Sequence, residues 1–293
     1  LAAYTAAMLN NQPMGFYSPA TLVKDAQRHG LKVKCIDVAR SDWSCTLEQE
    51  NDAWAVRLGL RYVKGLREGA VQALVAERAQ RSFESLDDLV RRVPHLRKDE
   101  LVTLAEVGAL NSLGAATRGR FHRRTALWQI ERAVRPTGAL LEKLEESAPD
   151  SPLNPMTPEE RLIADFRSAG LTVGKHPMAW RRAEMQRLGV YAAADLHRAP
   201  DGQRVRIAGC VICRQRPGTA KGFVFLSIED ETGIANVIVA PDLFQRERVA
   251  LTQEPFLLVE GVLQNQDHVI SIKAERILPL AQARVAIPSH DFR

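Results

Sequence analysis

The chain has 293 residues, and its 45% hydrophobic and 26% charged residues are typical of a globular protein with two or three domains. No apolar run reaches the roughly 18 residues that a membrane-spanning helix needs, so we expect no membrane partner. The chain opens at Leu1 without a signal-peptide pattern, which indicates a fragment of a longer protein located in the cytoplasm.

Residues 1–34 are predicted to be helical, and Val33–Val38 is a candidate for a short strand. An alanine-rich helix ends near Asn10, and Ser18 followed by Pro19 is a typical start for a second helix that runs to Gly30. Nothing in this region has the residue spacing of a catalytic site.

The segment Lys64–Gly69 is predicted to be a glycine turn between two helices. Such a turn aims backbone N–H groups at a helix N-terminus, where they hold a phosphate oxygen without reading the base sequence. Glycine lets the phosphate approach the backbone, and Arg67 supplies a positive charge. A plain helix-helix turn is the alternative, since glycine ends many helices. The candidate contacts to duplex DNA are Lys64, Gly65, Arg67, Gly69, Arg118, Arg120, Arg123 and Arg124.

The net charge of +5 is concentrated in two segments of the chain. Residues 115–135 contain six arginines and one acid, and residues 204–222 contain five cations and no acid. A basic segment attracts the phosphates of nucleic acids, although a solvated basic face is also common. Both segments are therefore candidates for nucleic-acid contact.

Residues 136–160 contain five prolines among acids and small residues, so a linker is predicted here. Thr157 and Glu160 then have the spacing of a capping box, with Pro158 in the first turn. This pattern predicts a helix that ends near Gly170.

From residue 204 onward, hydrophobic residues alternate with polar ones, a period that predicts strands. Five strands are expected, with a helical segment, Asp242–Leu251, before the fourth. The strands are Val205–Cys213, Phe223–Glu229, Ile234–Val239, Phe256–Leu263 and Val269–Ile277. This order is typical of an OB-fold barrel, which binds single strands across its second and third strands and the loop between its first two.

That loop, residues 214–222, is cationic, and Phe223 and Phe225 follow it. A basic loop beside exposed rings suits attraction of a phosphate backbone together with base stacking. One of the two rings is expected to seal the barrel or pack on a neighbour, and the sequence does not decide which. The candidate contacts to single-stranded DNA are Arg204, Arg206, Arg214, Arg216, Lys221, Phe223 and Phe225.

Cys210 and Cys213 have the spacing of half a zinc site. They lie in a predicted strand, where residues three apart face opposite sides, so their thiolates cannot share a metal unless the strand bends. No second such pair exists, since Cys35 and Cys45 lie elsewhere. We therefore predict reduced, structural cysteines and no metal site.

Nucleotidyl transfer with two metal ions needs carboxylates that converge on a rigid sheet. The densest acidic run, Glu229-Asp230-Glu231, lies at a predicted hairpin turn, where acids are usually solvated. The histidines are scattered, and no phosphate-binding loop or nucleophile elbow occurs. No catalytic residue and no cofactor are therefore expected in this chain.

Several segments resemble C-family DNA polymerases, the bacterial polymerase III alpha subunits. They are Asn11–Tyr17, Val63–Ala70, Arg214–Gly222 and Ile228–Gly233. The detailed resemblance is to the error-prone branch, whose chains end soon after the OB domain with a tail like Ser289–Arg293. It spans nearly the whole chain.

This resemblance implies a multidomain α+β protein, in which an all-α tandem helix-hairpin-helix domain is followed by a five-stranded OB-fold β-barrel. The implied domains are the remainder of the fingers (1–50), the helix-hairpin-helix domain (51–135), a proline-rich acidic linker with a helical connector (136–200), the OB domain (201–280) and a tail (281–293).

The resemblance also implies a function. The parent polymerase would add deoxynucleotides with Mg²⁺ in damage-induced, mutagenic (translesion) synthesis, whereas this C-terminal region would bind duplex and single-stranded DNA without the catalytic palm. Replicative members often have glycine where Arg67 stands, so the first hairpin is expected to be less open to a phosphate. Their clamp-binding motif is poorly matched at Leu140–Leu144, which implies a polymerase-like accessory protein that supplies clamp binding.

Two other functions are alternatives. The first is another DNA-processing enzyme with hairpin and OB modules, such as a ligase, but its nucleophilic lysine in a K-x-D-G setting and its four-cysteine zinc site are not present. The second is a protein-interaction module, in which the OB face docks a partner.

Overall fold

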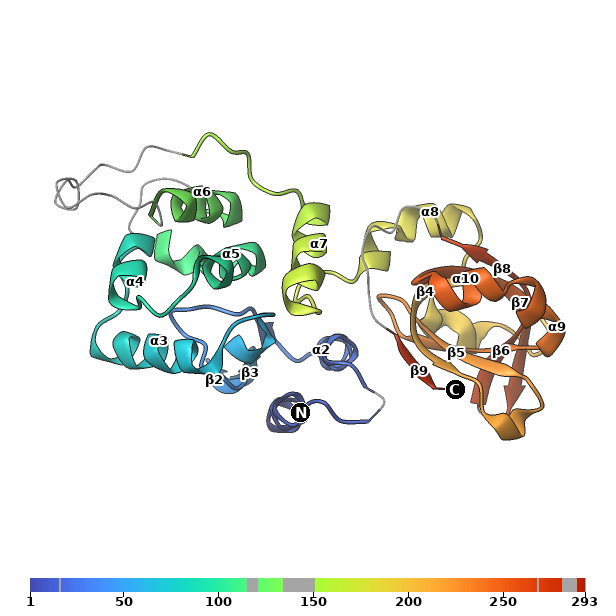
Figure 1. The fold of residues 1–293 in the computed structure, drawn as a ribbon. Coiled ribbons are helices and arrows are strands. Elements are labelled where there is room, and N and C mark those ends of the chain that lie inside the picture. Colours follow the sequence, from blue (N-terminus) through green and yellow to red (C-terminus); the bar gives the residue numbers. More distant parts are fainter. Residues whose placement is uncertain (16, 115–120, 134–150, 268, 281–288, 293) are drawn as a thin grey trace. The chain divides into compact units, whose positions relative to one another are not determined.

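The computed structural model describes the chain except for residues 16, 115–120, 134–150, 268, 281–288 and 293 (Figure 1). The chain forms two compact units. The hairpin unit consists of Leu1–Asn10 and Leu31–Leu171, and the barrel unit consists of Asn11–Gly30 and Thr172–Arg293. The predicted domain boundaries were taken from the domains of the polymerase family that the sequence resembles. Compact units need not coincide with such domains, so these boundaries stay predictions.

The hairpin unit contains a small sheet beside its first helix. Helix α1 (Ala2–Asn10) precedes β1 (Val33–Lys34), β2 (Thr46–Glu50) and β3 (Ala53–Arg57), and the strands lie in the order β1-β3-β2. The sequence did not reveal β2 and β3. Strand β2 alternates half-buried and exposed positions, but its half-buried positions carry Thr and Glu, so no alternation of apolar residues indicated a strand.

The rest of the hairpin unit is helical. Its helices are α3 (Glu68–Gln80), α4 (Leu86–Arg92), α5 (Lys98–Val107), α6 (Arg123–Ala133) and α7 (Pro158–Ala169). The predicted capping box of α7 is confirmed, because Thr157 and Glu160 bond each other's backbone N–H groups. Helices α5 and α7 end at Gly108 and Gly170, both with positive φ, a conformation that glycine adopts without strain.

The barrel unit is built on a closed sheet. Its strands are β4 (Arg204–Gln215), β5 (Val224–Glu229), β6 (Ile234–Val239), β7 (Phe256–Gln266) and β8 (Val269–Pro279). They follow the order β5-β6-β8-β7-β4, and pairing of β4 with β5 closes the barrel. Helices α9 (Pro241–Arg246) and α10 (Arg248–Gln253) precede β7. The predicted OB fold, with its five strands and its helical segment, is confirmed.

Two glycines let the barrel strands pack closely. A Cβ at Gly209 would lie 2.4 Å from the Glu229 carbonyl oxygen, and a Cβ at Gly261 would lie 2.2 Å from that of Lys273. Irregular register between Val211 and Cys213 and between Glu260 and Gly261 marks bulges. Such bulges bend strands and help a sheet to close.

Helix α2 (Pro19–Arg28), α8 (Arg182–Arg187) and the short strand β9 (His290–Phe292) complete the barrel unit. The predicted start of α2 is confirmed, since the Ser18 hydroxyl accepts a hydrogen bond from the Thr21 N–H. Strand β9 pairs in parallel with the end of β4.

The prediction of solvated acids at residues 229–231 is wrong for the first two. Glu229 is 4% exposed and Asp230 is 2% exposed. Asp230 accepts hydrogen bonds from the N–H groups of Thr232 and Gly233, which builds the turn. The run is buried because Arg28 and Arg182 of the same unit supply cations to it, which a local pattern does not reveal.

Candidate nucleic-acid interface

The predicted glycine turn of the hairpin unit is formed. The Leu66 N–H donates to the Val63 carbonyl, and Gly65 has a φ of +78° with open space where a side chain would be. Arg67 is the extended N-cap residue of α3. The backbone around Gly65 and Gly69 is therefore accessible to a phosphate.

A second hairpin with the same shape precedes α5. The Leu96 N–H donates to the Val93 carbonyl, and Arg97 is the extended N-cap of α5. The two turns share the sequence Val-X-X-Leu-Arg, at residues 63–67 and 93–97. The resemblance implied a tandem helix-hairpin-helix domain, but sequence reasoning did not locate this second hairpin, which the short internal repeat could have revealed.

A single buried carboxylate joins the two hairpins. Glu100, which is 2% exposed, accepts hydrogen bonds from the N–H of Arg67 at 3.0 Å, the N–H of Arg97 at 2.8 Å and the guanidinium of Arg67. Burial would raise the pKa of Glu100, but Arg67 and the two N–H groups hold the pKa at about 2. The Glu100 carboxylate is thus an anion within the fold that binds the backbone N–H groups of both N-cap residues, Arg67 and Arg97.

Three other cations predicted to contact duplex DNA, which the structure describes, also have partners inside the hairpin unit. The Lys64 ammonium donates to the Phe166 carbonyl at 3.0 Å. Arg123 forms an ion pair with Asp165 at 2.7 Å, and Arg124 forms one with Glu160 at 2.7 Å. The acids belong to α7, more than thirty residues away in sequence, so counting charges along residues 115–135 did not reveal them. Arg118 and Arg120 lie outside the described residues.

The loop of the barrel unit differs in this respect. Arg216 and Lys221 are exposed, and within the described ranges neither forms an ion pair. A short 3-10 turn, Gly218–Ala220, lies between them, and Lys221 has a φ of +49°. These two cations are available to an outside anion.

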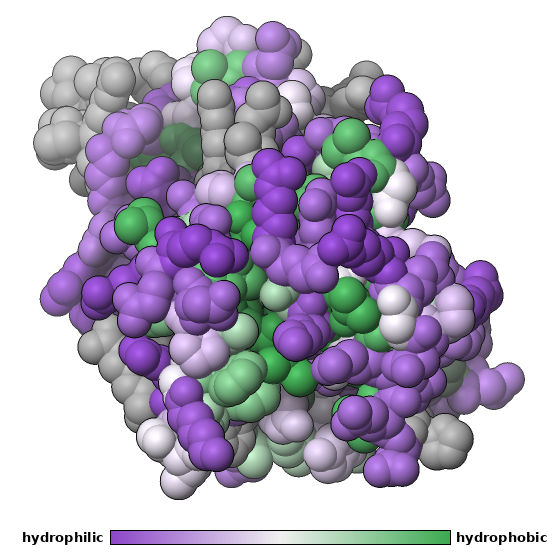
Figure 2. All heavy atoms as spheres, turned by 90° about the vertical axis from the view of Figure 1, so that its right-hand side faces the viewer, coloured by the Kyte–Doolittle hydropathy of each residue, from purple (hydrophilic) through white to green (hydrophobic). Residues whose placement is uncertain are grey.

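The phenylalanines beside this loop have different exposures. Val224, Leu226 and Ile228 fill the barrel, so the opposite face of β5 points outward. Phe225 lies on that face and is 37% exposed, whereas Phe223 is half-buried. Figure 2 shows hydrophobic side chains gathered in the middle of a mostly hydrophilic face. Phe225 is thus the ring that is more open to a base.

The remaining cations predicted for the barrel have partners. Arg204 pairs with Glu275 at 3.1 Å, and Arg206 pairs with Glu260 at 2.9 Å. Arg214 donates to the carbonyls of Leu251 at 2.6 Å and Glu254 at 2.7 Å, and also to the Ser289 hydroxyl. Arg214 therefore fixes the end of β4 to α10.

Among the described residues, no three His, Cys, Asp or Glu side chains come together as metal ligands. Cys210 is buried and Cys213 half-buried on either side of the β4 bulge. Burial raises the pKa of the Cys210 thiol far above its usual value, which disfavours the thiolate that a metal needs. In the described parts of the chain, no helix is long and apolar enough to cross a membrane.

Two family models match the chain. One is described as a helix-hairpin-helix motif and matches residues 30–120, and the other is described as an OB-fold nucleic acid binding domain and matches residues 205–280. The first includes both hairpins around Glu100, and the second includes the five strands of the barrel.

Curated relatives match nearly the whole chain. An error-prone DNA polymerase of Aromatoleum aromaticum is 42% identical over 94% of this chain and 26% of its own length. An error-prone DNA polymerase of Anaeromyxobacter dehalogenans is 40% identical over 100% of this chain and 26% of its own length. The chain thus spans about a quarter of the length of these relatives.

Solved structures match smaller parts of the chain. The asparaginyl-tRNA synthetase from Pyrococcus horikoshii is 26% identical over 27% of this chain and 20% of its own, with a TM-score of 0.25. A replication protein A heterotrimer bound to ssDNA is 23% identical over 28% of this chain and 60% of its own, with a TM-score of 0.22.

Proposed function

The chain belongs to the family of error-prone DNA polymerases, as a region of about a quarter of their length, and from this we propose that it is their C-terminal DNA-binding region. The barrel unit holds the single-stranded template, and the hairpin unit holds the duplex. Neither contact reads the base sequence, because both use phosphates and stacking.

The observation that carries the proposal is the loop of the barrel unit. Arg216 and Lys221 are exposed and form no ion pair within the described ranges, and the exposed Phe225 ring lies on the adjoining strand. Unpaired cations beside an exposed ring bind the backbone and the bases of a single strand together.

The hairpin unit contributes in a different way. Glu100 and α7 engage the four predicted cations that the structure describes, Lys64, Arg67, Arg123 and Arg124, so we assign the contact with duplex DNA to backbone N–H groups. The N–H groups in the first turn of a helix have no partner within the helix, and Gly69 lies there with no atom near its Cβ position. A duplex phosphate would approach at Gly65 and Gly69, beside Arg97.

For the whole protein, we propose nucleotide addition in damage-induced, translesion synthesis in the cytoplasm. The polymerase-like accessory protein that supplies clamp binding belongs to the same proposal. Catalysis would use Mg²⁺, but the described residues bring no set of carboxylates together for it, so no residue of this chain is assigned to the metal.

Fluorescence anisotropy with single-stranded oligonucleotides at several salt concentrations tests the loop. If about five phosphates are neutralised, log K should fall against log salt with a slope near −3.5. The double variant Arg216→Ala, Lys221→Ala should reduce this slope to about −2. A control that removes two paired cations of the same unit, Arg198→Ala with Arg246→Ala, should leave it nearly unchanged.

Two outcomes would contradict the proposal. A flat salt response of the unmodified chain would show that it does not bind nucleic-acid backbone. An unchanged slope in the loop variant would show that the strand passes elsewhere.

A further inference from the structure

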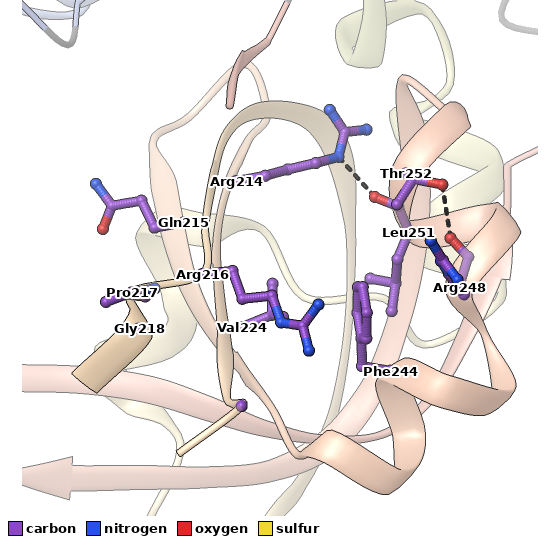
Figure 3. Close-up of a pocket in the computed structure, with 11 residues that line it drawn as sticks. Arg214, Gln215, Arg216, Pro217, Gly218, Val224, Phe244, Arg248, Leu251 and Thr252 are labelled. Atoms are coloured by element: carbon purple, nitrogen blue, oxygen red, sulfur yellow. Dashed lines mark hydrogen bonds between the residues drawn. The ribbon is translucent and has the colours of Figure 1, made fainter. Parts of the chain in front are cut away.

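A pocket of about 570 Å³ opens beside the cationic loop of the barrel unit (Figure 3). Its walls come from the end of β4, the start of the loop and the two helices α9 and α10. The volume lies within the range of about 300–1,000 Å³ that small-ligand sites occupy. Sequence reasoning did not indicate this pocket, since part of its wall comes from helices α9 and α10.

The lining of the pocket has two kinds of side chain. Val224, Phe244 and Leu251 form an apolar floor, and Arg214, Arg216 and Arg248 add positive charge. The residues that the structure describes around the pocket include no acid. An occupant should therefore have an apolar, flat part and a negative part.

Arg216 and Phe244 form a stack inside this pocket. The Arg216 guanidinium carbon lies 4.8 Å from the centre of the Phe244 ring, and Figure 3 shows the guanidinium turned toward that ring. A guanidinium is planar and stacks on aromatic faces. Since Arg216 is exposed, its second face is open to another flat ring.

Arg248 supplies a positive charge that can bind the phosphate of a nucleotide. It is exposed on α10, and within the described ranges it forms no ion pair. Arg214, in contrast, is held by the carbonyls of Leu251 and Glu254, so it shapes the wall. One phosphate at Arg248 and one base on Arg216 would fill both kinds of lining.

We propose that this pocket takes a single nucleotide of the bound strand, with its base stacked on the Arg216–Phe244 pair and its phosphate at Arg248. The inference rests on the proposed single-strand binding and adds a defined base site to it. The pocket begins where the cationic loop leaves β4, so a strand that follows the loop can turn one base into it.

The substitution Arg216→Lys tests the site, because it keeps the charge and removes the planar group. The experiment measures how tightly the whole chain binds an oligothymidine of twelve nucleotides and an abasic strand of the same length. Arg216→Lys should weaken binding of the thymidine strand about tenfold, as expected for one stacked base, and leave binding of the base-free strand unchanged. The matched control Arg246→Lys, on α9 outside the pocket, should change neither.

A second variant, Phe244→Leu, removes the ring while keeping an apolar side chain, and it should show the same selective loss. An equal loss on both strands, or no loss for Arg216→Lys on the thymidine strand, would overturn the base site. Failure of the unmodified chain to bind either strand at low salt would instead overturn the proposed function itself.

Discussion

The hairpin unit and the barrel unit each contain a basic segment, but the structure uses the two segments differently. In the segment of the hairpin unit, Arg123 and Arg124 form ion pairs with carboxylates of α7, and outside the segment Arg67 forms one with Glu100. In the barrel unit, Arg216 and Lys221 are exposed, and neither forms an ion pair with a described carboxylate. The net charge of a segment therefore does not tell how many of its cations can bind a phosphate.

The difference has a physical reason. A helical domain brings residues from distant helices together, and α7 carries the acids that neutralise α6. A loop that projects from a barrel meets few other elements. Even in the barrel unit, Arg214 is engaged because it belongs to a strand rather than to the projecting loop.

Removal of Glu100, the internal anion of the hairpin unit, should change the molecule most. Glu100→Gln should lower the free energy of unfolding of this unit by about 3 kcal/mol, since a buried carboxylate with charge-assisted bonds is lost. It should also release the charge of Arg67. The slope of log K against log salt for duplex DNA should become more negative by about 0.9.

Urea unfolding and duplex titration measure the two effects, and pH supplies an internal check. The pKa of Glu100 is about 2, below the value of 4.5 for a free glutamate, so its stabilisation is present above pH 4.5 and is lost as the pH falls toward 2. Glu100→Gln should lack this dependence. An unchanged duplex slope would show that Arg67 does not contact DNA even when its charge is free.

The barrel unit contains two buried titratable groups, Glu229 and His176. As in the hairpin unit, a cation of the same unit lies beside the buried acid. Burial raises the pKa of Glu229 to about 7, against the effect of Arg28, and burial lowers the pKa of His176 to about 3. Lys24 and Asp230 also act on both groups. The unfolded values are 4.5 and 6.5.

The two groups act in opposite directions. As the pH falls from 7 to 4.5, folded Glu229 takes up a proton that the unfolded chain does not, so stability rises. Below pH 6.5, unfolded His176 takes up a proton that the folded chain does not, so stability falls. Between pH 4.5 and 6.5, the two contributions nearly cancel.

Single substitutions should therefore uncover opposite responses. Glu229→Gln should make the barrel unit less stable by about 2 kcal/mol at pH 5 than at pH 6.5, and His176→Asn should make it more stable by a similar amount. Urea unfolding followed by Trp180 fluorescence reports this unit once the other tryptophans, Trp43, Trp54 and Trp128, are replaced. A flat response in both variants would contradict the assigned pKa shifts.

The sequence predicts the barrel well because its signals are local. Alternation of apolar residues located all five strands, and Ser18 and Thr157 marked two helix starts that the structure confirms. Strand β2 was missed because its half-buried positions carry polar residues, and β3 was missed because its buried residues are consecutive rather than alternating. The burial of Glu229 was missed because its partner Arg28 lies about 200 residues earlier in the chain.

The candidate site was harder to predict, since it depends on which side chains meet. Arg67 and Arg216 look alike in the sequence, and only the fold reveals that Glu100 engages the first and the Phe244 ring the second. The second hairpin was within reach as a repeat of Val-X-X-Leu-Arg. The pocket was not, because Phe244 and Arg248 come from helices that carry no nucleic-acid signature.

Within the barrel unit, cations that form ion pairs should contribute much less to DNA binding than cations that form none. Arg204 and Arg206 are exposed but lie beside Glu275 and Glu260, so each already interacts with a negative charge. Exposed ion pairs contribute less than about 1 kcal/mol, so replacing both arginines with alanine should leave stability nearly unchanged and weaken single-strand binding by less than threefold.

Removing the opposing acid should have the opposite effect on binding. Glu275→Gln frees Arg204 and should strengthen binding slightly, and more so at low salt because the gain is electrostatic. If Arg204→Ala weakened binding as much as Arg216→Ala, an exposed ion pair would not prevent its arginine from binding DNA. The difference between the cations of the two units would then be explained by their burial and not by their ion pairs.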